Sequence, residues 1–406
     1  MKPLHGLLLL VLAPLAFGQE APEKHDSEPE KRWWKGNLNA HSLWGDGDAL
    51  PETVVDWYRT NGYQFAAVVD APAALERWVP VSTSGPLTDE RVLAAKKRFG
   101  AEVVRVRTDE AGREVRLSTQ AELAARFDAP GRFIVVPGLE QRFEYEDRRV
   151  DLLTLGLAED LAMETPDEGL ELIRQVMGAA HSRSQALGRP ILTVLQRPNL
   201  SWSGRLPELI ESPDGFAMEV WSGHPEANAA GDRKHWSLEA LWSNTNAWRI
   251  PRHEWSPLFA FGGDDARHFH SNGDALATPG RTWLMVRAHE LTTDSLLRAM
   301  EARDFYVSNG VVLTDIQVDP TVVRVDAEPD PDGRDLLFRF VGSRRSPEGT
   351  VFIDQALFET MENPAIFHPS GDELYIRVQV LRTRAPGESL DSPWIGAWTQ
   401  AYEPYE

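Results

Sequence analysis

Short runs of consecutive apolar residues, separated by helical patterns, are the feature that most narrows the fold of this chain. Five such runs occur, namely FAAVVD (65–70), RFIVVPG (132–138), PILTVLQ (190–196), GFAMEVWS (215–222) and PLFAFGGDD (257–265). Runs without polar alternation are typical of strands buried on both faces. Segments 51–62 and 170–180 carry apolar residues at helical spacing instead. Strands that alternate with helices predict an α/β domain with a parallel sheet or barrel over residues 35–310.

The pattern changes after residue 311. Segments such as TVVRVDAE, DLLFRFVGS, TVFIDQAL and DELYIRVQVLR alternate apolar and polar residues with period two, and turn signals such as DPDG and SGDE separate them. This alternation is typical of strands with one buried face. We therefore predict a small antiparallel β-sandwich over residues 311–406. A chain of 406 residues is long enough for two or three domains.

The N-terminus has the pattern of a secretory signal. Lys2 supplies the positive charge, Leu7 to Leu15 form the apolar core, and small residues stand near Gly18. We predict a signal peptide over residues 1–18, a linker over 19–34, and export to the periplasm or the extracellular space. A retained membrane anchor is the alternative. No other apolar run approaches the ~20 residues that a bilayer requires, so we expect no integral membrane segment after cleavage.

Charge and cysteine content exclude several kinds of partner and site. The formal net charge is −20, and removal of residues 1–18 with Lys2 makes it −21. Such a surface repels phosphate backbones, so nucleic acid is not an expected partner. The chain has no Cys, which excludes thiolate zinc sites and cysteine nucleophiles. The sequence patterns of serine hydrolase elbows, Walker loops, dinucleotide-binding turns and His-Glu-x-x-His zinc sites are absent from the sequence.

Polar residues gather where the predicted strands end. In an α/β barrel, functional side chains lie at the carboxyl ends of the strands and in the loops that follow. The residues at these positions are Asn39, His41, Asp46, Asp70, Ala71, Glu140, Asp151, Arg197, Asp265 and Arg267. They contain few imidazoles and several carboxylates and guanidinium groups, which is an unusual mixture for a metal site.

Seven segments of the chain, taken in order, resemble one protein family. They are NLNAHSLWGDGD, VVDWYRTNGYQFAAVVD, PGLE, QRPN, VWSGHPEAN, GDD and MEARDFYVSNGV. Together they resemble bacterial PHP-domain proteins, the polymerase and histidinol phosphatase superfamily, from about residue 35 to the C-terminus. The resemblance implies a distorted (β/α)7 barrel followed by the small sandwich. It also implies up to three Mn, Zn or Fe ions that hydrolyse phosphoesters.

The resemblance implies a set of metal ligands that this chain keeps only in part. His41, Asp46, Glu140 and Asp265 match the family pattern. Histidines of the pattern are replaced at five positions, by Asn39, Ala71, Asp151, Arg197 and Arg267. Arginine stays protonated and cannot ligate a metal as imidazole does. The resemblance therefore points to a degenerate metal centre and to a catalytically inactive or impaired homologue.

The two arginines have a physical use where histidines are lost. Buried carboxylates without a partner cost several kcal/mol or take up protons. We predict that Arg267 pairs with Asp46 and that Arg197 pairs with Glu140 or Asp151, so that two cations replace two metals. Ala71 leaves room for the longer side chain. We also predict that such an inactive homologue binds an anionic small molecule, such as a phosphate or carboxylate, through Arg197, Arg267 and His224.

Other interpretations remain open. His41, Glu140 and Asp265, with Asn39 as a weak donor and Asp46 and Asp151 as weaker candidates, could hold one Mn, Zn or Fe ion in a single-metal phosphoester hydrolase. His224 could instead serve only a turn. The barrel could be a scaffold while the sandwich binds a protein partner of unknown kind. Among 14 Trp residues, the helical spacing of Trp242 and Trp248 predicts core positions, and a sugar-binding surface is the alternative.

Overall fold

The structure is a computed structural model that describes residues 30–70, 76–110, 112–159, 161, 163–385, 387–389 and 394–404. The predicted signal peptide, linker residues 19–29 and Ala71 lie outside these residues. The first strand, β1, covers Arg32–Ala40, so residues 32–34 belong to a strand and not to the predicted linker. Within the described part of the chain, no helix combines the length and apolar character needed to cross a bilayer.

Two sheets surround the main core. The first contains β1, β2 (Phe65–Val68), β6 (Ile134–Val135), β12 (Trp283–Ala288) and β13 (Phe305–Ser308). The second has the order β11 (Phe259–Gly263), β10 (Phe216–Ser222), β9 (Leu192–Gln196), β8 (Arg149–Leu155) and β7 (Gly138–Glu144). Hydrogen bonds join the sheets at both ends, from His41 N to Ala266 O at 2.9 Å and from Glu140 N to Val69 O at 2.6 Å.

The five predicted apolar runs are strands with parallel neighbours, but antiparallel strands that the sequence did not predict stand beside them. β1, β2 and β6 run parallel, as do β9, β10 and β11. β8 is antiparallel to both β7 and β9. A short turn closed by a bond from Tyr145 N to Arg148 O connects β7 to β8. So short a connection allows only an antiparallel hairpin, which is why the purely parallel expectation is wrong here.

Seven helices accompany the strands in the described residues. They are α1 (Pro51–Thr60), α2 (Asp89–Phe99), α3 (Gln120–Phe127), α4 (Gly169–Leu187), α5 (Leu206–Ile210), α6 (Leu238–His253) and α7 (Thr293–Glu301). The helical spacing in 170–180 places Ile173, Val176 and Ala180 in the core. In α6, however, Trp242 is buried whereas Trp248 is 50% exposed, so the core prediction for Trp248 is wrong. Helical spacing identifies a face, but the width of the buried stripe depends on the neighbouring elements.

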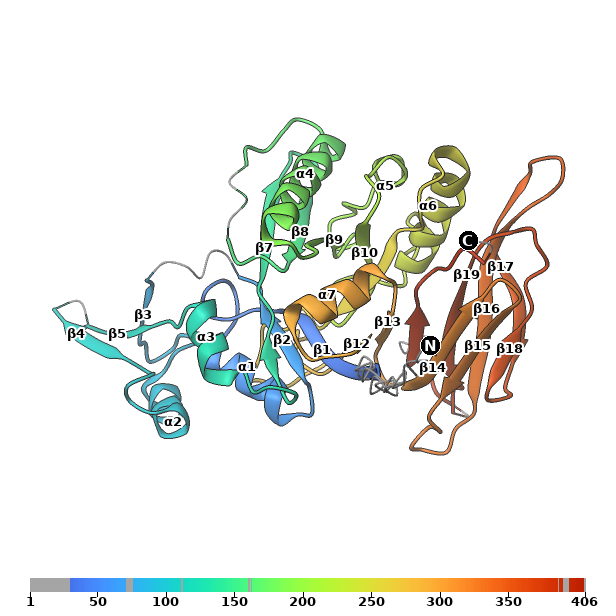
Figure 1. The fold of residues 1–406 in the computed structure, drawn as a ribbon. Helices are drawn as coiled ribbons and strands as arrows, with labels where there is room; N and C mark the ends of the chain where they lie inside the picture. The colour runs from blue at the N-terminus through green and yellow to red at the C-terminus, as the bar shows by residue number, and fades with distance from the viewer. Residues whose placement is uncertain are drawn as a thin grey trace, which may run out of the picture.

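An excursion whose helices and strands run from Trp78 to Phe127 interrupts the pattern between β2 and β6. It contains α2, α3 and a small antiparallel sheet of β3 (Trp78–Pro80), β5 (Gly112–Arg116) and β4 (Val106–Asp109). Leu87, Val92 and Val115 pack there in a separate core cluster, together with Trp44 from the loop after β1. Figure 1 shows this excursion at one end of the molecule and the C-terminal strands at the other.

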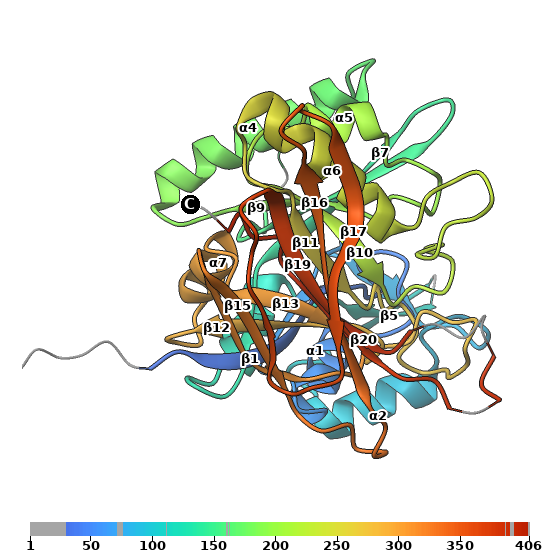
Figure 2. The same ribbon diagram turned by 90° about the vertical axis from the view of Figure 1, so that its right-hand side faces the viewer.

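The C-terminal strands are antiparallel, as their alternation predicted. They are β14 (Leu313–Asp319), β15 (Val322–Ala327), β16 (Leu336–Arg345), β17 (Val351–Thr360), β18 (Ala365–Phe367), β19 (Glu373–Arg382) and β20 (Gly396–Thr399). β14, β15 and β18 form one sheet, and the rest continue the first sheet through the order β17-β16-β19-β20-β13-β12-β1. Figure 2 shows β16, β17 and β19 in front of the helices and strands of the N-terminal part. A boundary at residue 311 therefore runs through a continuous sheet and not between two separate ones.

Candidate functional site

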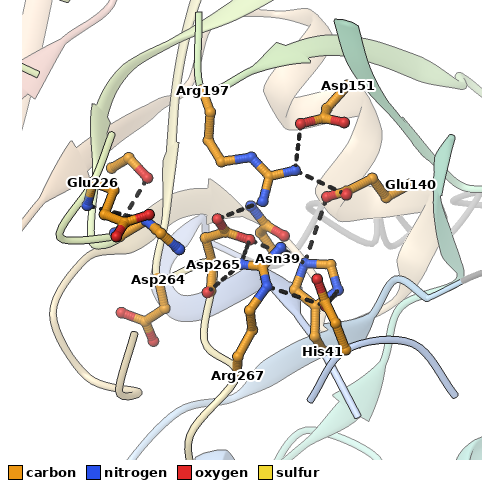
Figure 3. A network of polar contacts seen from close by, with 12 residues as sticks. Asn39, His41, Glu140, Asp151, Arg197, Glu226, Asp264, Asp265 and Arg267 are labelled. Atoms are coloured by element: carbon orange, nitrogen blue, oxygen red, sulfur yellow. Dashed lines mark hydrogen bonds and ion pairs between the residues drawn. The ribbon is translucent and has the colours of Figure 1, made fainter. Parts of the chain in front are cut away.

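The polar residues singled out in the sequence converge at one end of the strands. His41 follows β1, Arg197 follows β9, and Asp265 and Arg267 follow β11, while Glu140 lies within β7. Asp151 lies in β8 and is paired in register with Arg142 and Gln196. The carboxyl ends of parallel strands meet at one edge, and the β7–β8 hairpin extends its polar face over the same edge. Figure 3 shows Arg197 and Arg267 reaching Asp265 from above and below.

Arg197 forms the centre of the site. Its NH1 atom lies 2.6 Å from Asp265 Oδ2, and its NH2 atom lies 2.8 Å from Glu140 Oε1 and 2.7 Å from Asp151 Oδ2. Its side chain is 1% exposed. The pairings with Glu140 and Asp151 are those that the sequence suggested, and the pairing with Asp265 is additional. One guanidinium group thus bridges three buried carboxylates, with bonds short enough to be charge-assisted.

Backbone strain accompanies this bridge. Arg197 has φ of 44° and Asp265 has φ of 49°, in the left-handed region that side chains other than Gly rarely adopt. Such a conformation costs on the order of 1–3 kcal/mol per residue and persists where the surroundings over-determine it. The Arg197 backbone N–H also donates to Glu219 Oε2 at 2.7 Å. Both ends of the Arg197–Asp265 ion pair are therefore held in uncommon backbone conformations.

Arg267 is the second cation of the site. Its Nε atom lies 3.1 Å from Asp46 Oδ1, which is the pairing that the sequence predicted. Its NH1 atom also lies 2.5 Å from Asp265 Oδ1. Since Arg197 binds the other oxygen, both oxygens of the Asp265 carboxylate contact arginine. Asp265 is 0% exposed, and two guanidinium groups satisfy a charge that would otherwise be buried alone.

His41 lies between carboxylates on both sides of its ring. Nδ1 is 2.8 Å from Asp70 Oδ1, and Nε2 is 3.0 Å from Asp265 Oδ1. Ser42 fixes Asp70 through its backbone N–H and its hydroxyl, at 2.6 and 2.7 Å from Oδ2. Burial and Arg267 act to lower the pKa of His41, but Glu140, Asp265 and Asp70 outweigh them and raise that pKa well above its ordinary value. The carboxylates around the ring therefore favour the protonated form of His41.

Cations and anions balance in this cluster. Its five side-chain cations are His41, Arg142, Arg149, Arg197 and Arg267, and its five carboxylates are Asp46, Asp70, Glu140, Asp151 and Asp265. Burial opposes ionisation of Glu140 and Asp265, yet the Arg197 charge outweighs it and lowers the pKa of both carboxyls. We call these ten residues the salt-bridge network. With His41 in its protonated form, the five positive and five negative charges of the network balance.

The family resemblance implies metal ions, which need a cluster of imidazole nitrogens and carboxylate oxygens. Two groups bring suitable atoms within 4.8 Å of one another, namely His41, Glu140 and Asp265, and His41, Asp46 and Asp70. Both groups depend on His41, whose two ring nitrogens lie 2.8 Å from Asp70 Oδ1 and 3.0 Å from Asp265 Oδ1. Arginine nitrogens occupy both oxygens of Asp265. A metal needs a deprotonated imidazole and free carboxylate lone pairs, so these residues do not fit a metal ion in this arrangement.

The anion-binding alternative gains no support at Arg197. Both terminal nitrogens of Arg197 contact carboxylates, and the side chain is buried. An anion would have to displace a carboxylate from this guanidinium group. His224 accepts a bond from Glu226 N at its Nδ1 atom, at 3.1 Å, which is the turn role considered above. The geometry therefore places Arg197 among buried carboxylates and not at an open anion site.

Several residues of the site were missed in the sequence. Asp70 was singled out but given no partner, Asp264 was given no role, and Arg142, Arg149 and Glu219 were not singled out. Asp264 is buried and accepts bonds from the backbone N–H groups of Gly280, Arg281 and Thr282 and from the Tyr58 hydroxyl. Burial raises the pKa of Asp264 to about 6. The available signal for Asp264 was the pair of acidic residues in GGDD. Only one of two adjacent side chains can face the network, so the second carboxylate needs partners elsewhere.

The buried carboxyl group of Glu219 should make the stability of the folded protein depend on pH. Burial and the Asp265 charge raise the pKa of Glu219 from 4.5 to about 8. A raised folded-state pKa means that the stability contributed by the bound proton is fully present below pH 4.5 and is lost as pH rises through 8. We expect Glu219→Gln to be about 1–3 kcal/mol more stable than the natural protein at pH 9 and nearly equal to it at pH 5. Urea unfolding at both pH values measures this difference.

The matched control for Glu219→Gln is Glu226→Gln. Glu226 is exposed and lies in the loop after β10, so loss of its charge should leave the pH dependence unchanged. A Glu219→Gln protein that is less stable than the natural protein at pH 9 would contradict the expectation, because it would mean that the ionised carboxylate is favoured in the folded state.

Comparisons with known proteins give low similarity throughout. No protein-family model and no curated protein matches the chain. A two-domain protein of Bacteroides vulgatus that contains a predicted PHP-like metal-dependent phosphoesterase is 12% identical, with 90% of this chain and 95% of that chain covered and a TM-score of 0.39. A metal-dependent phosphoesterase, named as such by prediction, from Bifidobacterium adolescentis is 13% identical over 59% of this chain and 88% of its own, with a TM-score of 0.27. An amidohydrolase of Chromobacterium violaceum with bound sulfate and no metal is 14% identical over 60% of this chain and 89% of its own, with a TM-score of 0.25. The structural neighbours thus include one protein with a predicted PHP-like domain.

Proposed function

We propose that this protein is a PHP-like protein in which the salt-bridge network stands where a metal centre would be, and that it does not hydrolyse phosphoesters through bound metals. The observation that carries the proposal is the Arg197 guanidinium group, which lies 2.6–2.8 Å from Asp265, Glu140 and Asp151. Activation of water for phosphoester hydrolysis in the family resembled here uses adjacent metal ions. A guanidinium group supplies charge but no open coordination position and no acidic bound water.

We further propose a distorted seven-stranded barrel as the frame of the site. In this arrangement β1, β2, the consecutive β6 and β7, then β8, β9, β10 and β11 form one ring. Support comes from the two hydrogen bonds that join the sheets, His41 N to Ala266 O and Glu140 N to Val69 O. Both bonds involve residues of the network or their immediate neighbours. The closure of the frame and the formation of the network are therefore expected to depend on each other.

The proposal is tested by the metal content of the purified protein. After incubation with Mn, Zn and Fe salts and removal of the excess by gel filtration, mass spectrometry should find far less than one ion per chain. Hydrolysis of p-nitrophenyl phosphate should stay at the level of the buffer. The charge balance of the network is the reason, because an added divalent ion would bring uncompensated positive charge into a buried site.

The competing function is a single-metal phosphoester hydrolase that uses His41, Glu140 and Asp265. The spacing of these three residues within 4.8 Å is the observation in its favour. Close to one tightly bound ion per chain, lost in His41→Ala together with metal-dependent turnover, would replace our proposal with this one.

A further inference from the structure

A small aromatic cavity lies beside the salt-bridge network and is not part of it. Two loops form it, the segment 197–205 after β9 and the segment 223–237 between β10 and α6. Both loops leave the carboxyl ends of their strands, so the cavity opens at the same edge as the network. Its volume is about 230 Å³. Pockets for drug-sized ligands measure about 300–1,000 Å³, so this cavity has room for a single ring.

Flat aromatic surfaces line the cavity. The rings of Trp202 and His235 are stacked, with centroids 3.7 Å apart and planes 12° from parallel. Asp232 Oδ1 lies 2.8 Å from His235 Nδ1 and fixes that ring. Trp202 has φ of 52°, a strained conformation for a bulky side chain. Trp236 is 50% exposed at the same cavity. The backbone of Trp202 is thus strained, and the indole of Trp236 is exposed to solvent. Strained backbone and exposed apolar surface are both found at binding sites.

A buried polar group faces the same cavity. Asn199 is 4% exposed, and its Nδ2 atom donates to Asn228 O at 3.1 Å and to Trp236 O at 2.9 Å. Both bonds use the amide nitrogen, so they leave the Asn199 Oδ1 atom as an acceptor. The side chain of Asn199 lines the cavity, as does that of Lys234. The cavity can accept a hydrogen bond at Oδ1 and can donate one from the Lys234 ammonium group.

From these observations we propose that the cavity binds one pyranose ring of a carbohydrate. A pyranose has a flat apolar face that suits the indole surfaces and hydroxyl groups that suit Asn199 Oδ1 and Lys234. The formal charge of −20 disfavours phosphorylated rings such as nucleotides. The proposal does not depend on the metal question, because no residue of the salt-bridge network lines this cavity.

The test uses saturation-transfer NMR on the full chain with methyl glucoside, methyl galactoside, methyl mannoside and methyl N-acetylglucosaminide. At least one of them should receive saturation at its ring protons. Trp236→Ala should weaken binding of that glycoside by about threefold to tenfold through loss of ring stacking. Trp248→Ala is the matched control, since Trp248 on α6 is also 50% exposed but does not line the cavity.

A second variant tests the same proposal in case Trp236→Ala changes the conformation of the loop. His235→Ala removes the ring stacked on Trp202 and should also weaken glycoside binding, with thermal melting as the check on folding. The proposal fails if no glycoside receives saturation, or if Trp236→Ala and His235→Ala bind as the natural protein does. Adenosine is the remaining probe, and binding of adenosine without any glycoside would overturn the assignment to carbohydrate.

Discussion

Replacement of Arg197 by Met is expected to destabilise the folded protein by about 3–5 kcal/mol at pH 7, the range measured when one member of a buried ion pair is removed. Met fills a similar volume, so the loss reflects charge and not a cavity. Glu140, Asp151 and Asp265 would keep their positions among buried groups without their shared cation. Urea unfolding followed by tryptophan fluorescence measures the change in the free energy of unfolding.

The direction of the pH dependence is part of the same expectation. In the natural protein the pKa values of Glu140 and Asp265 are lowered. A lowered folded-state pKa contributes stability that is present above the unfolded pKa and is lost as pH falls through the folded one. Without Arg197 this contribution disappears, and both carboxyls take up protons more readily. The destabilisation by Arg197→Met should therefore be smaller at pH 5 than at pH 7.

Arg142→Met is the matched control for this experiment. Arg142 contacts Glu140 and Asp151 as Arg197 does, but at 3.5 and 3.4 Å, and its side chain is 39% exposed. An exposed ion pair contributes about 0–1 kcal/mol. Equal losses in the two variants would mean that burial of Arg197 has no energetic role, and the metal-replacing interpretation would lose its basis.

Conversion of Arg197 and Arg267 together to His is expected to create a metal site. The network would lose two fixed cations and keep its five carboxylates, which leaves negative charge for a divalent ion to balance. Imidazole is shorter than the arginine side chain, and a metal–ligand bond of about 2.0–2.2 Å can fill the resulting gap. Affinity for Zn should rise by about a hundredfold or more over the natural protein, since even changes around metal ligands alter affinity by 10–100-fold.

Zinc titration monitored by mass spectrometry after gel filtration distinguishes the double variant from its control. Arg142→His adds an imidazole at the half-exposed edge of the same network and should gain little affinity. If the double variant binds no more zinc than the control, then the carboxylates of the network are not arranged to bind a metal. Replacement of histidine by arginine would then not be the reason why the network holds no metal.

Much of this site could be expected from the sequence, and the reasons for the omissions are physical. Arg197 and Arg267 stand at ligand positions of a recognisable pattern, so their carboxylate partners followed from charge. The contact between His41 and Asp70 was missed although both residues follow neighbouring parallel strands. Arg142 and Arg149 were missed because they belong to an antiparallel hairpin, which the alternation of strands and helices did not predict.

Some parts of the fold could likewise be predicted from the sequence and others could not. Apolar runs gave the positions of β2, β9, β10 and β11, because burial on both faces leaves a local signal. The excursion with β3, β4 and β5 was not expected, since its strands are short and β4 and β5 contain charged residues. The continuation of the first sheet into β20 also has no local signal, because strand pairing across distant segments depends on which edges meet.

That continuous sheet limits how the chain can be divided. β13 pairs with β12 on one side and with β20 on the other, and β12 pairs with β1, which leads directly to His41. A cut at residue 311 would leave each fragment with an open strand edge, and open edges invite association with other chains. The C-terminal part therefore cannot be exchanged as an interchangeable module, and any fusion or graft should carry the whole span from β1 to β20.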